Sequence, residues 1–150
     1  MRTKKCLDGF TLIETLLAVL IVAILASIAV ASYARYIERV RVLQAQTTIQ
    51  VLSVKIKLYE LTNQAYPVSL TTLGDDPLDP WGRKYSYMDL SGPGNGGARK
   101  DRNLNPLNSD FDLYSLGKDG LTKTQITNKV SLDDVIRAND GLFIDLAENF

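Results

Sequence analysis

The sequence contains no histidine and only one cysteine, Cys6, which precedes the first long apolar segment. Histidine is the commonest general base and cysteine a frequent nucleophile, so their scarcity removes the most common catalytic side chains. A lone cysteine also cannot form a disulfide within the chain. Basic and acidic residues balance at 17 each, which gives no electrostatic reason to expect nucleic-acid binding. These absences argue against an enzyme of a histidine- or cysteine-dependent class and against a nucleic-acid-binding protein.

Glycine and proline are absent from Phe10 to Tyr66. Within this stretch, Leu16 to Ala34 is apolar except for two serines and one tyrosine hydroxyl. A helix of this length crosses a hydrocarbon core of roughly 30 Å. A secretory signal peptide would have a shorter apolar part, about 7–15 residues, followed by a cleavage site. The stretch therefore predicts a transmembrane helix.

The helix is predicted to continue beyond the membrane to about Asn63. Apolar residues recur at the three- and four-residue spacing of one helical face. They are Tyr36, Val40, Leu43, Ala45, Ile49, Leu52, Ile56 and Tyr59. This stripe needs a cover, and the sequence after Pro67, beginning with Leu70 and Leu73, is expected to supply it.

Glu14 interrupts the beginning of the apolar segment. A carboxylate in such a segment costs free energy and usually has a partner, although the helix dipole also stabilises a glutamate in a first turn. The stretch GFTLIE, preceded by the leader MRTKKCLD, resembles the cleavage and methylation site of type IV prepilins and type II secretion pseudopilins. The resemblance implies that a prepilin peptidase cuts between Gly9 and Phe10 and methylates the Phe10 amine. It also implies that Glu14 pairs with the Phe10 amine of a neighbouring subunit during filament assembly.

The resemblance divides the chain into three parts. Residues 1–9 are the leader, residues 10–34 the transmembrane and filament-core helix, and residues 35–150 a periplasmic head that includes the rest of the helix. Basic residues flank both ends of the span, so charge alone does not orient it. The resemblance implies a single pass through the bacterial inner membrane, with the N-terminus in the cytoplasm. Removal of Cys6 with the leader leaves no thiol, which favours the pseudopilins over the many type IV pilins that have a C-terminal disulfide loop.

The first part of the head contains the sequence DPWG, Asp79 to Gly82, which resembles a motif of the major pseudopilins. Its aspartate and proline favour a turn, and its tryptophan is expected to anchor that turn in the core. Alternation of Tyr85 and Tyr87 with polar residues then predicts a strand. The glycine-rich segment from Ser91 to Asp110 predicts a solvated loop with exposed Arg99, Lys100 and Arg102, the alternative being a basic contact patch between subunits.

The stretch DFDLYSLGKDG, Asp110 to Gly120, resembles the DLYSLGADG strand and turn of the major pseudopilins. This resemblance implies a calcium site with Asp119 and Asp134 as ligands. Asp133 is the alternative second aspartate, and the backbone carbonyl of Leu116 is a further ligand. Calcium takes six to eight oxygen ligands, so other carbonyls would have to complete the site.

The same residues have an interpretation without metal. Asp119 and Gly120 form a turn, and the run from Ser131 to Asp134 is a capping box for a short helix through Ala138. The connection between the two aspartates, LTKTQITNKVSLD, is also longer than in the family and has no glycine. The segment Leu142–Leu146 is expected to be the last strand, with Leu142 and Ile144 on one side.

These elements predict an α+β fold of the type IV pilin-like class, with a long N-terminal helix whose second half packs on a small antiparallel sheet. The resemblance implies a structural subunit of a homo-oligomeric filament rather than an enzyme. The leading function is the major pseudopilin of a type II secretion system, which works with minor pseudopilins and an inner-membrane platform to export proteins. A type IV pilin for adhesion, motility or DNA uptake is the alternative in the same class. A membrane-tethered periplasmic enzyme or ligand-binding domain is the alternative from another class, and no motif supports it.

Overall fold

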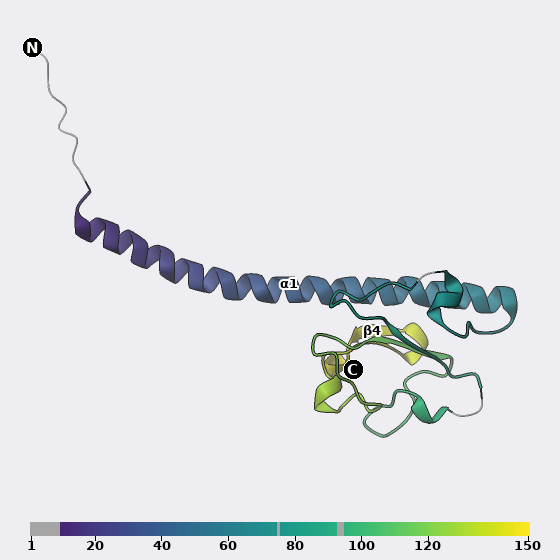
Figure 1. Cartoon of the computed structure of the whole chain (residues 1–150). Coiled ribbons are helices and arrows are strands. Elements are labelled where there is room, and N and C mark those ends of the chain that lie inside the picture. The colour runs from purple at the N-terminus through teal and green to yellow at the C-terminus, as the bar shows by residue number, and fades with distance from the viewer. Residues whose placement is uncertain (1–9, 75, 93–94) are drawn as a thin grey trace, which may run out of the picture. The chain divides into compact units, whose positions relative to one another are not determined.

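The computed structural model describes residues 10–74, 76–92 and 95–150. A helix, α1 (Leu12–Asn63), precedes the strands, which are β1 (Ser86–Asp89), β2 (Phe111–Ser115), β3 (Val135–Ala138) and β4 (Phe143–Leu146) (Figure 1). The chain forms two compact units, one that ends at Glu38 and a head that comprises Arg39–Phe150. The predicted leader, including Gly9, lies outside the described residues.

Helix α1 is uninterrupted over its 52 residues, as the absence of glycine and proline predicts. Its N-terminal part contains a window that is long and apolar enough to cross a membrane, and none of that window is buried. This composition agrees with the predicted transmembrane segment. In the head, the same helix continues as far as Asn63, the predicted end.

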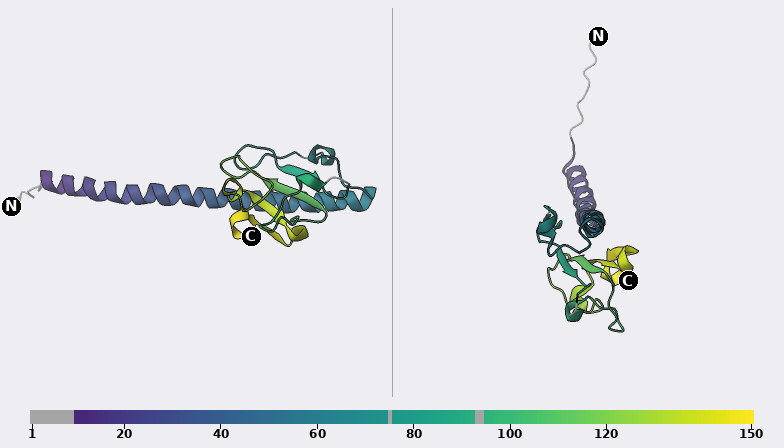
Figure 2. Two further views of the ribbon diagram at one scale, coloured as in Figure 1. Left: turned by 90° about the horizontal axis from the view of Figure 1, so that it is seen from below. Right: turned by 90° about the vertical axis from the view of Figure 1, so that its right-hand side faces the viewer.

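The four strands of the head form one antiparallel sheet in the order β1-β2-β3-β4. The sheet lies along the head portion of α1, as the two views of Figure 2 show. Alternate residues of β2 point to opposite faces, so Phe111 and Leu113 reach the helix while Tyr114 reaches the other side. That far side has a second apolar cluster, which includes Ile126 and Ile136. The sheet is therefore covered on both faces.

The main core lies between α1 and the sheet. Its helical contribution consists of residues at most 1% exposed, namely Ala45, Ile49, Leu52 and Ile56. They belong to one cluster with Leu70, Phe111 and Val135. Burying each of Ile49, Leu52 and Ile56 contributes roughly 1.5–3 kcal/mol, so this contact stabilises the attachment of the helix to the sheet. The predicted return of Leu70 and Leu73 to the stripe is confirmed.

The first part of the predicted stripe is wrong. Tyr36, Val40 and Leu43 are exposed. The reason is helical geometry, because the step from Leu43 to Ala45 rotates the helix by about 200° at roughly 100° per residue. The two series of apolar residues therefore occupy opposite faces, and only the second faces the sheet.

The predicted strands around Tyr87, at the DLYS segment and near the C-terminus are confirmed as β1, β2 and β4. The short helix predicted from Ser131 through Ala138 is wrong, because Val135–Ala138 is strand β3. All four residues of β3 are buried, including Arg137, so the strand lacks the alternation of buried and exposed residues that separates a strand from a helix. The predicted last strand began at Leu142, but β4 begins at Phe143, and Leu142 is 93% exposed at the turn before it.

Candidate functional site

The beginning of α1 holds the carboxylate that the sequence singles out. The Glu14 Oε2 atom accepts hydrogen bonds from the Thr11 backbone N–H at 2.8 Å and from the Thr11 hydroxyl at 2.9 Å. In return, the Glu14 N–H donates to Thr11 Oγ1 at 3.4 Å. This reciprocal arrangement is a capping box, which satisfies backbone donors that a helix N-terminus otherwise leaves unpaired. Glu14 therefore has a partner within its own chain.

The capping box fixes the Glu14 carboxylate next to Phe10, the residue that precedes Thr11. Phe10 is exposed and lies before the first helical residue. Both Thr11 bonds use the Oε2 atom of the carboxylate. The role of Thr11 was not predicted above, although the spacing Thr-x-x-Glu is the sequence signal for a capping box.

The DPWG turn is built around a buried aspartate. Asp79 Oδ1 accepts hydrogen bonds from the backbone N–H groups of Trp81 and Arg83, at 3.1 and 2.8 Å. Asp79 Oδ2 accepts the hydroxyl of Ser115, at the end of β2, at 2.6 Å. Trp81 is half-buried against the main core, as predicted. This motif is thus structural, because it ties the turn before β1 to the neighbouring strand.

The turn that follows β2 brings two of the predicted ligands together. Asp133 Oδ2 accepts the backbone N–H groups of Lys118 and Asp119, at 2.9 and 3.0 Å. Asp119 Oδ1 accepts the N–H of Leu121 at 2.7 Å, and the carbonyl of Leu116 accepts the N–H of Gly120 at 3.2 Å. The two aspartate side chains and the Leu116 carbonyl thus form the hydrogen bonds of the turn. For Asp119, this is the role predicted by the interpretation without metal.

Asp134 points elsewhere, into a buried ion pair. Its Oδ2 lies 2.6 Å from Nη2 of Arg99 and accepts the Thr122 hydroxyl at 2.6 Å. Burial raises the pKa of Asp134, and the hydrogen bond from Thr122 and the charge of Arg99 oppose that rise. Among the described residues, no group of three or more histidine, cysteine, aspartate or glutamate side chains is placed to hold a metal ion. Calcium binding stays a prediction.

Arg99 lies in a different environment from the one that its sequence predicts. It was expected to be exposed in a solvated loop, but only 3% of it is exposed. Its guanidinium lies 4.3 Å from the centre of the Tyr114 ring, and its backbone N–H donates to Asp112 at 2.6 Å. The expectation holds for Arg102, which is exposed. No local pattern marks Arg99 as buried, because its partners are 13 to 35 residues away in sequence.

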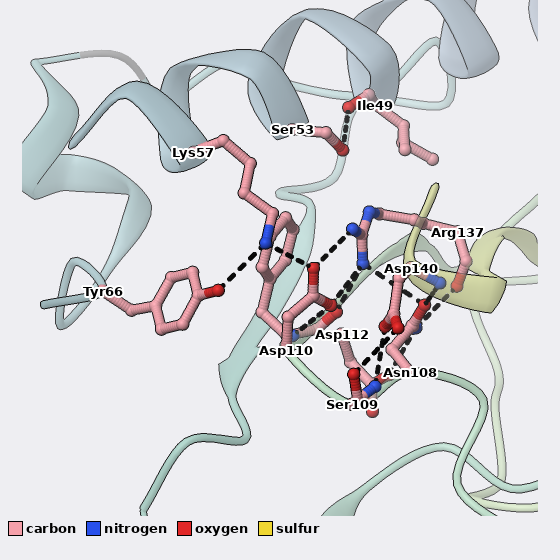
Figure 3. Close-up of polar contacts among 11 residues, drawn as sticks. Ile49, Ser53, Lys57, Tyr66, Asn108, Ser109, Asp110, Asp112, Arg137 and Asp140 are labelled. Atoms are coloured by element: carbon pink, nitrogen blue, oxygen red, sulfur yellow. Dashed lines mark hydrogen bonds and ion pairs between the residues drawn. The ribbon is translucent and has the colours of Figure 1, made fainter. Parts of the chain in front are cut away.

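A second buried charge cluster joins α1 to the sheet (Figure 3). Asp110 receives both terminal nitrogens of Arg137, at 2.8 and 2.7 Å, and Nζ of Lys57 lies 2.9 Å from its Oδ2. Lys57 also donates to the hydroxyl of Tyr66 at 3.0 Å, and Arg137 stacks on the ring of Phe111. Burial alone would raise the pKa of Asp110, but the bonds from Arg137 and Lys57 hold it below its usual value. This cluster links the head portion of α1 to the sheet.

Comparison with protein families gives a match at the N-terminus. Residues 8–30 match the family model described as the prokaryotic N-terminal methylation motif. These residues include Phe10, Thr11 and Glu14, so the match covers the capping box described above.

Comparison with curated proteins extends the similarity to the head. The type II secretion system core protein G of Pseudomonas aeruginosa is 31% identical over 135 residues, which cover 75% of this chain and 84% of the relative. The proteins of the same name from Vibrio cholerae and Escherichia coli are 28% and 29% identical, over 80% and 85% of this chain and 86% and 94% of the relatives. No solved structure matches the chain at a comparable level of significance. The similarity to these relatives is therefore not confined to the N-terminal motif.

Proposed function

Because the chain belongs to the family of the type II secretion system core protein G, the major pseudopilins, we propose that it forms the pseudopilus that drives protein export across the outer membrane. The observation that carries this proposal is the GFTLIE motif at the beginning of an uninterrupted apolar helix, joined to a head that is similar to those relatives over most of its length. The family is structural, and we assign no catalytic activity to the chain.

The first step of the proposal is maturation. A prepilin peptidase removes residues 1–9 and methylates the amine of Phe10. The helix from Phe10 to Ala34 holds the subunit in the inner membrane, with the N-terminus in the cytoplasm and the head in the periplasm. The length and apolar character of the helix support the membrane anchor.

The second step is assembly of a homo-oligomeric filament, in which Glu14 pairs with the Phe10 amine of a neighbouring subunit. The Thr11 bonds support this role because they hold the carboxylate at the end of the helix, close to the site of cleavage. Removing one partner of a buried ion pair costs roughly 3–5 kcal/mol, so loss of the carboxylate should impair assembly strongly. Insertion itself should become easier, because a charge is removed from an apolar segment.

A deletion strain tests the proposal through parallel assays of protein secretion and surface piliation. Secretion should be lost, and the wild-type gene should restore it. The Glu14→Val variant should reach the membrane but not restore secretion, whereas Glu60→Val, which changes a glutamate in the head portion of the same helix, should restore it. Loss of surface pili with secretion intact would instead favour the type IV pilin. In the natural host, minor pseudopilins and the inner-membrane platform are the expected partners.

A further inference from the structure

Arg99, Thr122 and Asp134 form a buried ion-pair cluster, here called the clamp, in the region where the resemblance implies calcium. Its centre is Arg99, which pairs with Asp134 at 2.6 Å through Nη2 and donates to Thr122 through Nη1. The pair is almost completely buried, since Arg99 is 3% exposed and Asp134 is 0% exposed. Tyr114 covers the guanidinium, which lies 4.3 Å from the centre of its ring. Stacking and charge pairing of this kind suit the planar guanidinium of arginine.

The clamp also closes the long connection between β2 and β3. The Ser131 hydroxyl accepts the N–H of Lys123 at 2.8 Å and lies 3.2 Å from the carbonyl of the same residue. Lys100 donates its N–H to the carbonyl of Thr124 at 2.8 Å and accepts the N–H of Ile126 at 3.0 Å. Ile126 then enters the second apolar cluster. The connection is thus attached to the loop that carries Arg99 by backbone bonds, by side-chain bonds and by a buried apolar residue.

The carboxylate oxygens of Asp134 are not placed to bind a calcium ion. Calcium would have to lie roughly 2.3–2.6 Å from a ligand oxygen, and Oδ2 already has the positively charged guanidinium at 2.6 Å. Repulsion between two such cations is weakly screened in a buried site. Oδ1 of Asp134 is buried and has no hydrogen-bond partner among the described residues, but one oxygen falls far short of the roughly six to eight that calcium takes.

Nor do the other predicted ligands complete such a site. Asp119 and Asp133 use carboxylate oxygens to accept backbone N–H groups of the turn, and the Leu116 carbonyl accepts another. In the ranges that the structure describes, no third acidic, histidine or cysteine side chain joins any pair of these residues in a metal-binding group.

We propose that in this chain the guanidinium of Arg99, in place of a divalent cation, neutralises Asp134 and fastens the connection between β2 and β3 to the head. The folded head is then independent of calcium. The connection itself supplies Thr122, Ser131 and Ile126, which hold it in this position.

The test is thermal unfolding of the full-length, processed protein in detergent micelles, with calcium chloride and with excess EDTA. The wild-type melting temperature should be the same in both. Arg99→Gln should melt about 10 °C lower in both, since it leaves a buried carboxylate unpaired. Lys100→Gln, which changes the adjacent basic residue but leaves the pair intact, is the matched control and should melt within a few degrees of wild type.

A double-mutant cycle extends the test. Asp134→Asn should also lower the melting temperature, and the Arg99→Gln/Asp134→Asn variant should lose less than the sum of the two single losses. If Arg99→Gln does not fold, calorimetric titration of the wild type with calcium decides, because the proposal requires no specific binding. A rise in the wild-type melting temperature with calcium, specific calcium binding by the wild type, or equal stability of Arg99→Gln and Lys100→Gln would overturn the proposal.

Discussion

Replacing Asp110 with asparagine should show how much the buried charge cluster contributes to the stability of the head. The aspartate neutralises Arg137, which is 3% exposed, through two bonds of 2.8 and 2.7 Å. It also forms an ion pair with Lys57, whose side chain is 42% exposed. Asparagine has nearly the same shape and keeps one acceptor oxygen, so the substitution removes the charge with little change in packing.

The expected loss of stability depends on how deeply each of the two cations, Lys57 and Arg137, is buried. Breaking a buried ion pair from one side costs roughly 3–5 kcal/mol. We expect about 3 kcal/mol, because Lys57 can reach water whereas Arg137 cannot. For a protein of this size, this corresponds to a melting temperature lower by about 6–12 °C.

The assay is thermal unfolding of the processed protein in detergent, with Asp76→Asn as the matched control. Asp76 pairs with Lys84 at 2.5 Å, but the two side chains are 24% and 68% exposed. A surface pair of this kind contributes about 0–1 kcal/mol, so the control should melt within a few degrees of wild type. If Asp110→Asn melts no lower than Asp76→Asn, the cluster does not stabilise the head and the reasoning is wrong.

The pH dependence provides a second readout of the same prediction. The pKa of Asp110 is lower in the folded protein than the value of about 3.9 in unfolded chains. Its contribution to stability is therefore complete above that unfolded value and is lost as the pH falls toward the folded pKa. The difference in melting temperature between wild type and Asp110→Asn should shrink below about pH 4. An equal difference at neutral and acid pH would contradict this explanation.

Three further substitutions test other parts of the structure. Gly117→Ala should destabilise the head by more than about 2 kcal/mol in a denaturant titration. The reason is that φ is +61° and a Cβ would lie 2.1 Å from a backbone carbonyl oxygen. Gly82→Ala, where a Cβ has open space, should cost less in the same titration. Ile49→Ala should cost about 2–5 kcal/mol in that titration, and Val51→Ala, on the exposed side of the helix, should be close to neutral. Thr11→Val should weaken the start of α1 by about 1 kcal/mol and reduce cross-linking of subunits in membranes. Thr11→Ser should keep both the stability of the helix start and the cross-linking. Unchanged cross-linking of Thr11→Val would show that the threonine hydroxyl is dispensable.

The helix, the N-terminal motif and three of the four strands could be predicted because their signals are local. A stretch of 52 residues without glycine or proline predicts a long helix, and the alternation of Tyr85 and Tyr87 with polar residues predicts a strand. Strand β3 could not be separated from a helix, because both faces of the sheet are covered at Val135–Ala138 and the alternation disappears.

The burial of the two arginines, Arg99 and Arg137, could not be predicted either, but the reason is different. Arg99 pairs with a residue 35 positions away, and Arg137 with one 27 positions away. The sequence around Arg99 is rich in glycine and charge, which is typical of a solvated loop. Only the folded sheet brings each arginine to its carboxylate and its aromatic ring. The capping role of Thr11 is the opposite case, since its four-residue signal was present in the sequence.

The most direct test of the central claim is the intact mass of the subunit isolated from purified filaments. We expect one species that corresponds to residues 10–150 with a single added methyl group on Phe10. A Gly9→Val variant should retain the leader and be absent from filaments, because the peptidase site is expected to accept only a small residue there. Wild-type filaments whose subunits still carry Met1 to Gly9, or that lack the methyl group, would contradict the assignment of the chain as a processed pseudopilin.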